Sequence, residues 1–190
     1  LLQSGVGWNR EALMAAVGKR HHECARLLLR YEADPNFRGG RETPLSTAAK
    51  QNDNIMVHEL LQARADANFA CDHPPLTWAV YNRNYAMIRR LLDGGADVYS
   101  ACRRSESSLL HIAAMRPDVR VLRLLLEASR RSGVPDGIKT SYIDAPNRPD
   151  GDVPLHIAAR LPGTHRAIEA LLWYGADATQ RNYAGKTPQD

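Results

Sequence analysis

The chain has 190 residues, of which 44% are hydrophobic and 24% charged, and its formal net charge is +4. This is the composition of an ordinary folded protein and excludes intrinsic disorder. Aromatic residues make up only 6%, which argues against a β-sandwich or a β-barrel. No apolar run approaches the roughly 18 residues of a membrane span, and the first residues lack the features of a secretory signal. We therefore expect no insertion into a membrane.

Three cysteines, at positions 24, 71 and 102, are too few and too scattered for a disulfide framework. They predict a reducing intracellular compartment, cytoplasmic or nuclear, and delivery of the protein into a host cell is also consistent with them. Cys24 falls at an apolar helix position and is expected to face the core. The basic residues comprise 21 Arg and 4 Lys, and each half of the chain carries a charge of +2. This even spread gives no focused patch for nucleic acid.

One sequence pattern recurs five times along the chain. Its copies align on leucines that lie 32, 31, 34 and 45 residues apart: Leu13, Leu45, Leu76, Leu110 and Leu155. Each copy predicts two short helices. The first helix follows a turn such as Thr43-Pro44, where Thr can cap the helix and Pro suits its first turn. Small residues such as Ala48 and Ala49 would then let neighbouring helices approach closely.

The second predicted helix of each copy carries apolar residues three and four positions apart, which define one helix face. These stripes comprise Val57, Leu60 and Leu61; Ile88, Leu91 and Leu92; Leu122, Leu125 and Leu126; and Ile168, Leu171 and Leu172. Gly95 and Gly175 are expected to end two of these helices. One helix pair cannot bury its stripe alone, whereas stacked pairs share a continuous core, so the pattern predicts an all-α solenoid. Replacing Leu92 by Ala is accordingly expected to cost about 2–5 kcal/mol of folding free energy.

The repeated units resemble ankyrin repeats, in which a TPLHxAA turn and helix are followed by a Leu-Leu helix and a GADVN segment. The closest copies are VPLHIAAR (153–160) with LLWYGADAT (171–179), and RETPLSTAAK (41–50) with LLQARADAN (60–68). The resemblance covers nearly the whole chain. It implies a solenoid of stacked helix-turn-helix units joined by β-hairpin-like fingers.

The predicted organisation is a single array over residues 1–190. It consists of a partial or capping repeat at 1–9, repeats at 10–41, 42–72, 73–106, 107–151 and 152–185, and the start of a further repeat at 186–190. The fourth repeat is 11 residues longer than the third, and the excess is expected as a loop near 129–141. Such an insertion is either tolerated at the surface or functional.

The His of the family's turn occurs here only as His111 and His156, and the other repeats have Met14, Ser46 and Thr77 at that position. The resemblance implies that this His fastens the turn by hydrogen bonds. The first three repeats are therefore expected to fasten their turns differently.

Motifs for catalysis are missing from the sequence, which contains no G-x-S-x-G, P-loop or H-E-x-x-H pattern. His21 and His22 near Cys24, and Cys71 near His73, are interpreted as chance neighbours rather than metal ligands. The sequence thus predicts neither an enzyme nor a cofactor or metal site.

The resemblance implies that the first helices and the fingers line a concave groove. Trp78 and Tyr81 lie three residues apart on one helix face, and we expect them to anchor an apolar group of a partner. The alternative is that Trp78 packs against the adjacent repeat. Carboxylate clamps are predicted at Arg38, Arg41, Arg103, Arg104 and Arg116, with further contacts from Phe37, Phe69, Tyr99 and Met115.

These features predict a protein–protein interaction scaffold, monomeric on its own, that holds an acidic or amphipathic segment in its groove. Two alternatives stay open. The Arg-rich fingers could bind a phosphorylated ligand or nucleic acid, although the absence of a focused basic patch argues against it. The array could also be a structural spacer within a larger protein.

Overall fold

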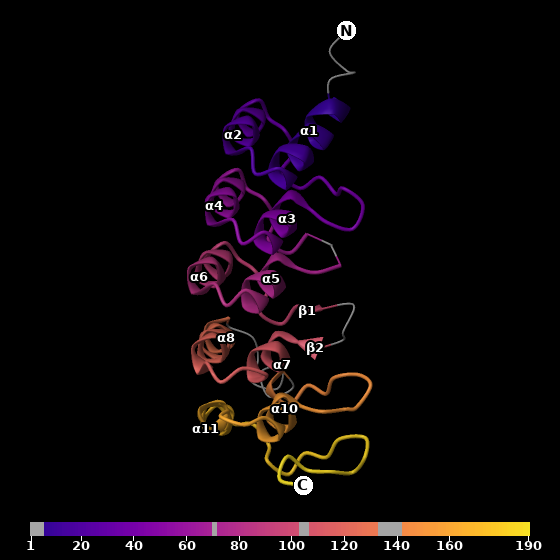
Figure 1. Cartoon of the computed structure of the whole chain (residues 1–190), viewed down its shortest axis with the longest axis vertical. Helices are drawn as coiled ribbons and strands as arrows, with labels where there is room; N and C mark the ends of the chain where they lie inside the picture. The colour runs from indigo at the N-terminus through magenta and orange to yellow at the C-terminus, as the bar shows by residue number, and fades with distance from the viewer. Residues whose placement is uncertain (1–5, 70–71, 103–106, 133–141) are drawn as a thin grey trace. The chain divides into compact units, whose positions relative to one another are not determined.

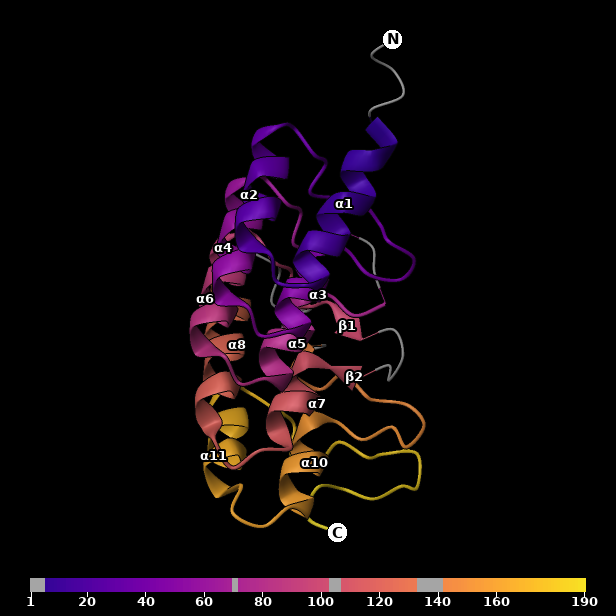
Figure 2. The same cartoon turned by 45° about the horizontal axis from the view of Figure 1, so that its top comes forward.

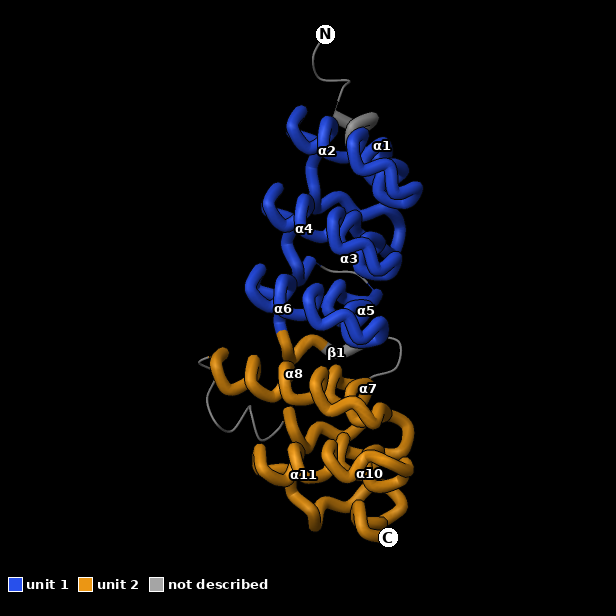
Figure 3. Tube along the Cα trace, turned by 60° about the vertical axis from the view of Figure 1, so that its left-hand side comes forward, with its two compact units in different colours: residues 1–97 blue, residues 98–190 orange. Residues whose placement is uncertain are grey.

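Paired short helices make up the computed structural model of the chain, which describes residues 6–69, 72–102, 107–132 and 142–190. The chain divides into two compact units, residues 1–97 and residues 98–190 (Figure 3). The boundary falls within the predicted third repeat, so each unit is described by itself.

Unit 1 is built from helix pairs in which a first and a second helix follow each other in the chain. The first helices are α1 (Val6–Gly18), α3 (Pro44–Lys50) and α5 (Pro75–Tyr81), and the second helices are α2 (His22–Arg30), α4 (Asn54–Gln62) and α6 (Tyr85–Asp93). The first helices pack on one another in one row and the second helices in another (Figures 1 and 2). The predicted boundary at residue 10 falls inside α1, so residues 6–9 belong to this helix.

Unit 2 repeats the same arrangement. Its first helices are α7 (Leu109–Ala114) and α10 (Pro154–Arg160), and its second helices are α8 (Val119–Arg131) and α11 (His165–Trp173). Strands β1 (Ala101–Cys102) and β2 (Ser107–Ser108) pair antiparallel and precede α7. In unit 1, a bridge between Gly39 and Glu42 forms a similar finger. The predicted all-α fold of stacked helix pairs joined by hairpin-like fingers is confirmed.

The aligned leucines of the first helices form the core of each unit. Their exposed fractions do not exceed 2%: Leu13, Leu45, Leu76, Leu110 and Leu155. Ala48 and Ala79, at the small-residue positions, are also fully buried. Because these side chains are small, adjacent first helices pack closely.

The apolar stripe of the second helices is narrower than the sequence predicts. Leu91 is fully buried, but Leu92 is half-buried, and the equivalent Leu172 is 44% exposed. Successive helix residues point about 100° apart, so the residue after a core leucine turns toward the flank of the helix. Among the second helices in the described residues, only α8 fully buries the equivalent residue, Leu126. The prediction that Cys24 faces the core is wrong for the same reason, since Ala25 does so and Cys24 is exposed.

The turns and helix ends largely follow the sequence. Gly95 and Gly175 have φ of 84° and 96° and end their helices as predicted, whereas Glu32 and Arg64 adopt the same left-handed conformation without being glycine. In the second repeat, Ser46 takes the place of the turn His. Its hydroxyl accepts a hydrogen bond from the backbone N–H of Thr43 at 2.8 Å.

The two turn histidines tie neighbouring repeats of unit 2 together. Nδ1 of the fully buried His111 accepts from the Ser108 backbone N–H at 3.1 Å, and its Nε2–H donates to the Asp152 carbonyl at 2.8 Å. His156 makes the equivalent Nε2–H bond to the Lys186 carbonyl at 2.9 Å. The fastening role that the resemblance implies for these histidines is confirmed.

The insertion of the fourth repeat begins later than the sequence predicts. Helix α8 continues to Arg131 and buries Ser129, so residues 129–131 are helical and not part of a loop. Residues 133–141 lie outside the described residues. Tyr142 and Ile143, which follow, are both buried.

Because Leu91 is buried and Leu92 only half-buried, the large loss of folding free energy is now expected for a substitution of Leu91. Replacing Leu91 by Ala should lower the free energy of unfolding by about 2–5 kcal/mol, because it leaves a cavity in a closed core. The same change at half-buried Leu92 should cost distinctly less. Urea unfolding of both variants checks this, and equal losses would contradict the burial assignment.

The stability of unit 2 should fall as the pH drops below about 6.5, the usual pKa of His. Burial lowers the pKa of His111, and the bond to the Asp152 carbonyl opposes this only in part. The folded form therefore takes up a proton only at a lower pH than the unfolded chain does, and between these two pH values stability falls by at most about 1.4 kcal/mol per pH unit. Urea unfolding at pH 7.5 and 5.5 measures the loss. His111→Gln should reduce it and the exposed-site control His58→Gln should not; identical pH slopes for all three proteins would refute this.

Candidate functional site

Helix α5 of unit 1 carries a pair of adjacent aromatic side chains, Trp78 and Tyr81. The rings of Trp78 and Tyr81 have centroids 6.2 Å apart, as expected for residues three apart on one helix face. His73, from the finger that leads into α5, meets the Trp78 ring edge-on at 5.2 Å. Tyr81 is 48% exposed and Trp78 is half-buried. The pair thus presents an aromatic surface with a polar hydroxyl on it.

Helix α3 adds a cation to this aromatic surface. Nζ of Lys50 lies 5.4 Å from the centroid of the Trp78 ring, within the range of a cation–π interaction. The same ammonium group donates to Oε1 of Glu42 at 2.7 Å, and Thr47 donates to the other oxygen of Glu42 at 3.1 Å. We call Glu42, Lys50, His73, Trp78 and Tyr81 the Trp78 cluster.

The burial of the Trp78 indole is relevant to the two roles predicted for it, packing against the adjacent repeat and anchoring a partner. Its Nε1 is enclosed and has no hydrogen-bond partner in the part of the chain that the structure describes. The nitrogen-bearing edge of the indole is therefore buried, although the side chain as a whole is only half-buried. Tyr81 is the more accessible of the two rings, so it offers the cleaner test of binding.

The predicted finger residues of unit 1 lie largely at the surface. Arg38 is exposed, and its Nε donates to the carbonyl of Gly40 at 2.9 Å. Arg41 is 74% exposed and lies 3.5 Å from the carboxylate of Asp72 in the next finger. Phe69 is exposed as well, whereas Phe37 is half-buried.

Of the predicted binding residues in unit 2, some are exposed and others are not described. Met115, at the end of α7, is 46% exposed, and Arg116 beside it is exposed too. Arg103 and Arg104 lie outside the described residues. The predicted site therefore draws on both units, and the contacts described above join only its unit 1 members.

Tyr99, a predicted finger contact, is half-buried and makes contacts within unit 2. Its hydroxyl donates to the Ser129 carbonyl at 3.0 Å, and its ring packs edge-on against Tyr142 at 4.9 Å. Tyr99 thus holds the end of α8 against the chain that returns from the insertion. One sequence signal could have indicated this: Tyr99 replaces the Asn found at the equivalent positions 36 and 68, in the repeat just before the lengthened one.

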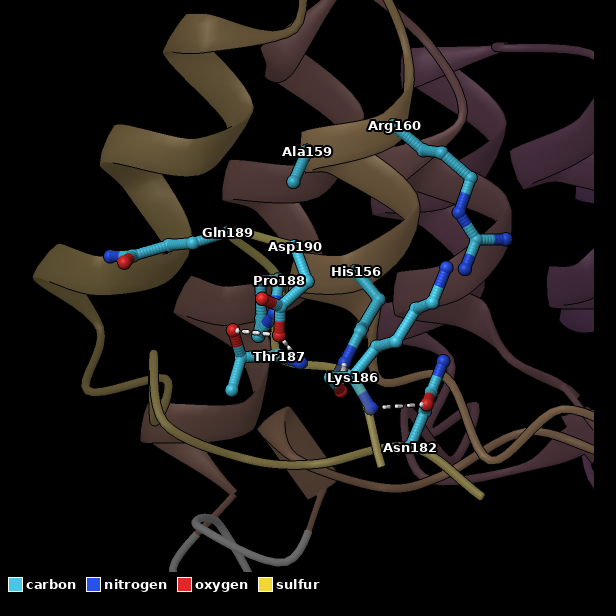
Figure 4. A pocket seen from close by; sticks show the side chains of 9 residues that line it. All are labelled: His156, Ala159, Arg160, Asn182, Lys186, Thr187, Pro188, Gln189 and Asp190. Atoms are coloured by element: carbon cyan, nitrogen blue, oxygen red, sulfur yellow. Dashed lines mark hydrogen bonds between the residues drawn. The ribbon is translucent and has the colours of Figure 1, made fainter. Parts of the chain in front are cut away.

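A polar hollow of about 480 Å³, which no sequence motif indicates, lies between α10 and the last residues of the chain (Figure 4). Its polar groups largely bond one another. Asp190 accepts from both the backbone N–H and the hydroxyl of Thr187, at 2.7 and 2.8 Å, and Asn182 accepts from the backbone N–H of Lys186 at 3.0 Å. Arg160, at the rim, pairs with the buried carboxylate of Asp152 at 2.7 Å. Few hydrogen-bonding groups of the hollow are therefore left to bind a ligand.

Potential metal ligands and membrane-spanning helices can be assessed for the described residues. Within them, no three His, Cys, Asp or Glu side chains gather closely enough to hold a metal ion. The helices described there also lack the combination of length and apolar character that a membrane crossing requires.

The sequence model of the ankyrin-repeat family, "Ankyrin repeats (3 copies)", matches residues 1–71 and 76–182. The chain therefore belongs to the ankyrin-repeat family, as its repeats and fold indicate. Ankyrin repeats are general protein–protein interaction modules.

Several curated proteins share this similarity. Protein PhlB of Serratia liquefaciens is 31% identical over 157 residues, which cover 80% of this chain and 62% of PhlB. NF-kappa-B inhibitor zeta of Mus musculus is 30% identical over 77% of this chain and 19% of its own length. Mitochondrial disaggregase of Homo sapiens is 29% identical over 96% of this chain and 28% of its own. The chain spans less than two thirds of the length of each.

Proposed function

We propose that this chain is a non-enzymatic, intracellular protein-binding module, and that the Trp78 cluster of unit 1 holds a segment of the partner. The observation that carries the proposal is the aromatic pair itself. Tyr81 and Trp78 lie side by side on the surface of α5, with a cation stacked on one ring. Tyr and Trp are the side chains most often found to dominate the energy of protein interfaces.

The charges around the cluster indicate the chemistry of the partner segment. Lys50 is neutralised by Glu42, so the centre of the cluster carries little net charge and suits an apolar side chain. Arg38 and Arg41 on the fingers are exposed and can take carboxylates at the rim. An amphipathic segment with one apolar anchor and acidic flanks fits this arrangement.

Anchor and rim residues should affect binding differently. Replacing Tyr81 by Ala should weaken the complex at least about 10-fold, and replacing Trp78 about 30-fold, because buried aromatic anchors typically contribute about 2 kcal/mol or more. Reversing the charge of Arg38 to Glu should mainly slow association at low salt. Titration calorimetry and stopped-flow association with a partner purified after affinity capture would measure these effects.

Matched controls exist in the same unit. Tyr31 on the second-helix side is 76% exposed, so Tyr31→Ala removes an accessible aromatic ring outside the cluster. Arg30→Glu is the corresponding charge control. Far-UV circular dichroism and the melting temperature confirm that each variant is folded. If the partner binds Tyr81→Ala and Trp78→Ala as tightly as the parent protein, the Trp78 cluster is not the binding site.

A further inference from the structure

A second aromatic cluster lies in unit 2, on second helices for which the sequence predicts core residues but no binding residues. Trp173, at the end of α11, is 72% exposed. Its ring meets that of Tyr174 edge-on at 4.7 Å, and the guanidinium of Arg130 on α8 lies 5.6 Å from the centroid of each ring. Two aromatic rings and an arginine thus meet at the surface, although Arg130 and Trp173 lie 43 positions apart in the chain.

A hollow of about 380 Å³ opens beside these rings, between α8 and α11. The two helices lie side by side in both Figure 1 and Figure 3. Buried Ala170 contributes to the lining, Trp173 and Tyr174 form an aromatic wall, and Arg123, Glu127 and Glu169 complete it. The volume is sufficient for a large apolar or aromatic side chain.

The other repeats have no comparable tryptophan. The positions equivalent to Trp173 are Arg30, Gln62, Asp93 and Glu127, all of them polar. A solvated polar residue is the expected choice on the outward side of a second helix. Trp173 is largely exposed and therefore contributes little to the core, so its apolar surface is available to a partner.

The charges of the two helices specify that partner. Together α8 and α11 carry five arginines and two glutamates, an excess of positive charge. Both glutamates line the hollow with Arg123, and Arg130 lies over its two aromatic rings. Two cations thus balance two anions around the hollow, which leaves a site for an uncharged side chain. Arg130 and Arg131 provide positive charge at the end of α8. Arg131 is 82% exposed, and its long 4.0 Å contact with Glu127 is a surface ion pair that contributes little.

We propose that the outer surface of α8 and α11 is a second docking surface, which binds an acidic protein segment by one apolar or aromatic side chain. The anchor enters the hollow against Trp173 and Tyr174, and its acidic neighbours pair with Arg130 and Arg131. We call these residues and the hollow the Trp173 surface. It lies in unit 2 and is independent of the Trp78 cluster in unit 1, so either proposal can fail without the other.

Random 12-residue peptides displayed on phage, selected on the intact chain, provide the probe. Selected peptides should combine a large apolar residue with at least two Asp or Glu residues. Peptides whose affinity falls with Tyr81→Ala are assigned to the Trp78 cluster and set aside. For the remainder, fluorescence anisotropy should show Trp173→Ala weakening binding at least about 30-fold. Arg130→Glu should also weaken peptide binding, and this loss should be larger at low salt than at high salt.

Tyr31→Ala is the matched control, since Tyr31 occupies the position of Tyr174 in the first repeat and is 76% exposed. It should leave peptide affinity unchanged, and all variants should keep the parent's melting temperature. Binding that is insensitive to Trp173→Ala, or selection of basic peptides, would overturn the proposal. So would a Trp173-dependent self-association in sedimentation velocity, or Trp173-dependent binding to phosphatidylserine vesicles.

Discussion

Burial of one leucine-lined face between consecutive helix pairs is the constraint on which the rest of each unit depends. A single pair of such short helices cannot remove its apolar stripe from water, so each pair needs a neighbour. Leu45 and Leu76 of unit 1 are buried in this way. Hydrogen bonds between equivalent turns then fix the register, as when the Asp66 backbone N–H donates to Asn36 at 2.7 Å and that of Asp97 donates to Asn68 at 2.7 Å.

The residues that form the core and hold the register are not free to bind a partner, which restricts where binding surfaces can arise. The core occupies one face of every helix, and the turns are engaged in holding repeats in register, so variation is tolerated mainly on what remains exposed. In unit 1 the first helices and fingers carry the Trp78 cluster. In unit 2 the second helices carry the Trp173 surface. Both combine aromatic rings with a cation placed over them, Lys50 in one case and Arg130 in the other. A chain with two such surfaces could hold two segments at once, which is what a scaffold requires.

The sequence alone determined the features that depend on local spacing. The repeated leucines predicted the helix pairs and their core, because residues three and four apart share a helix face. The same geometry predicted that Trp78 and Tyr81 would be neighbours. Gly95 and Gly175 marked helix ends, because a left-handed residue there costs glycine least.

Tertiary structure decided the features that depend on helix phase and on contacts between repeats. Neighbouring helix residues point about 100° apart, so a sequence alignment that is wrong by one residue assigns the wrong side chain to the core. This is why Cys24 and Leu92 were expected in the core, although Cys24 is exposed and Leu92 only half-buried. Tyr99 packs on Tyr142, and Arg130 stacks on Trp173, across more than 40 residues of chain. Such pairs depend on how repeats stack and where an insertion returns, and neither is encoded in the spacing of residues within one repeat.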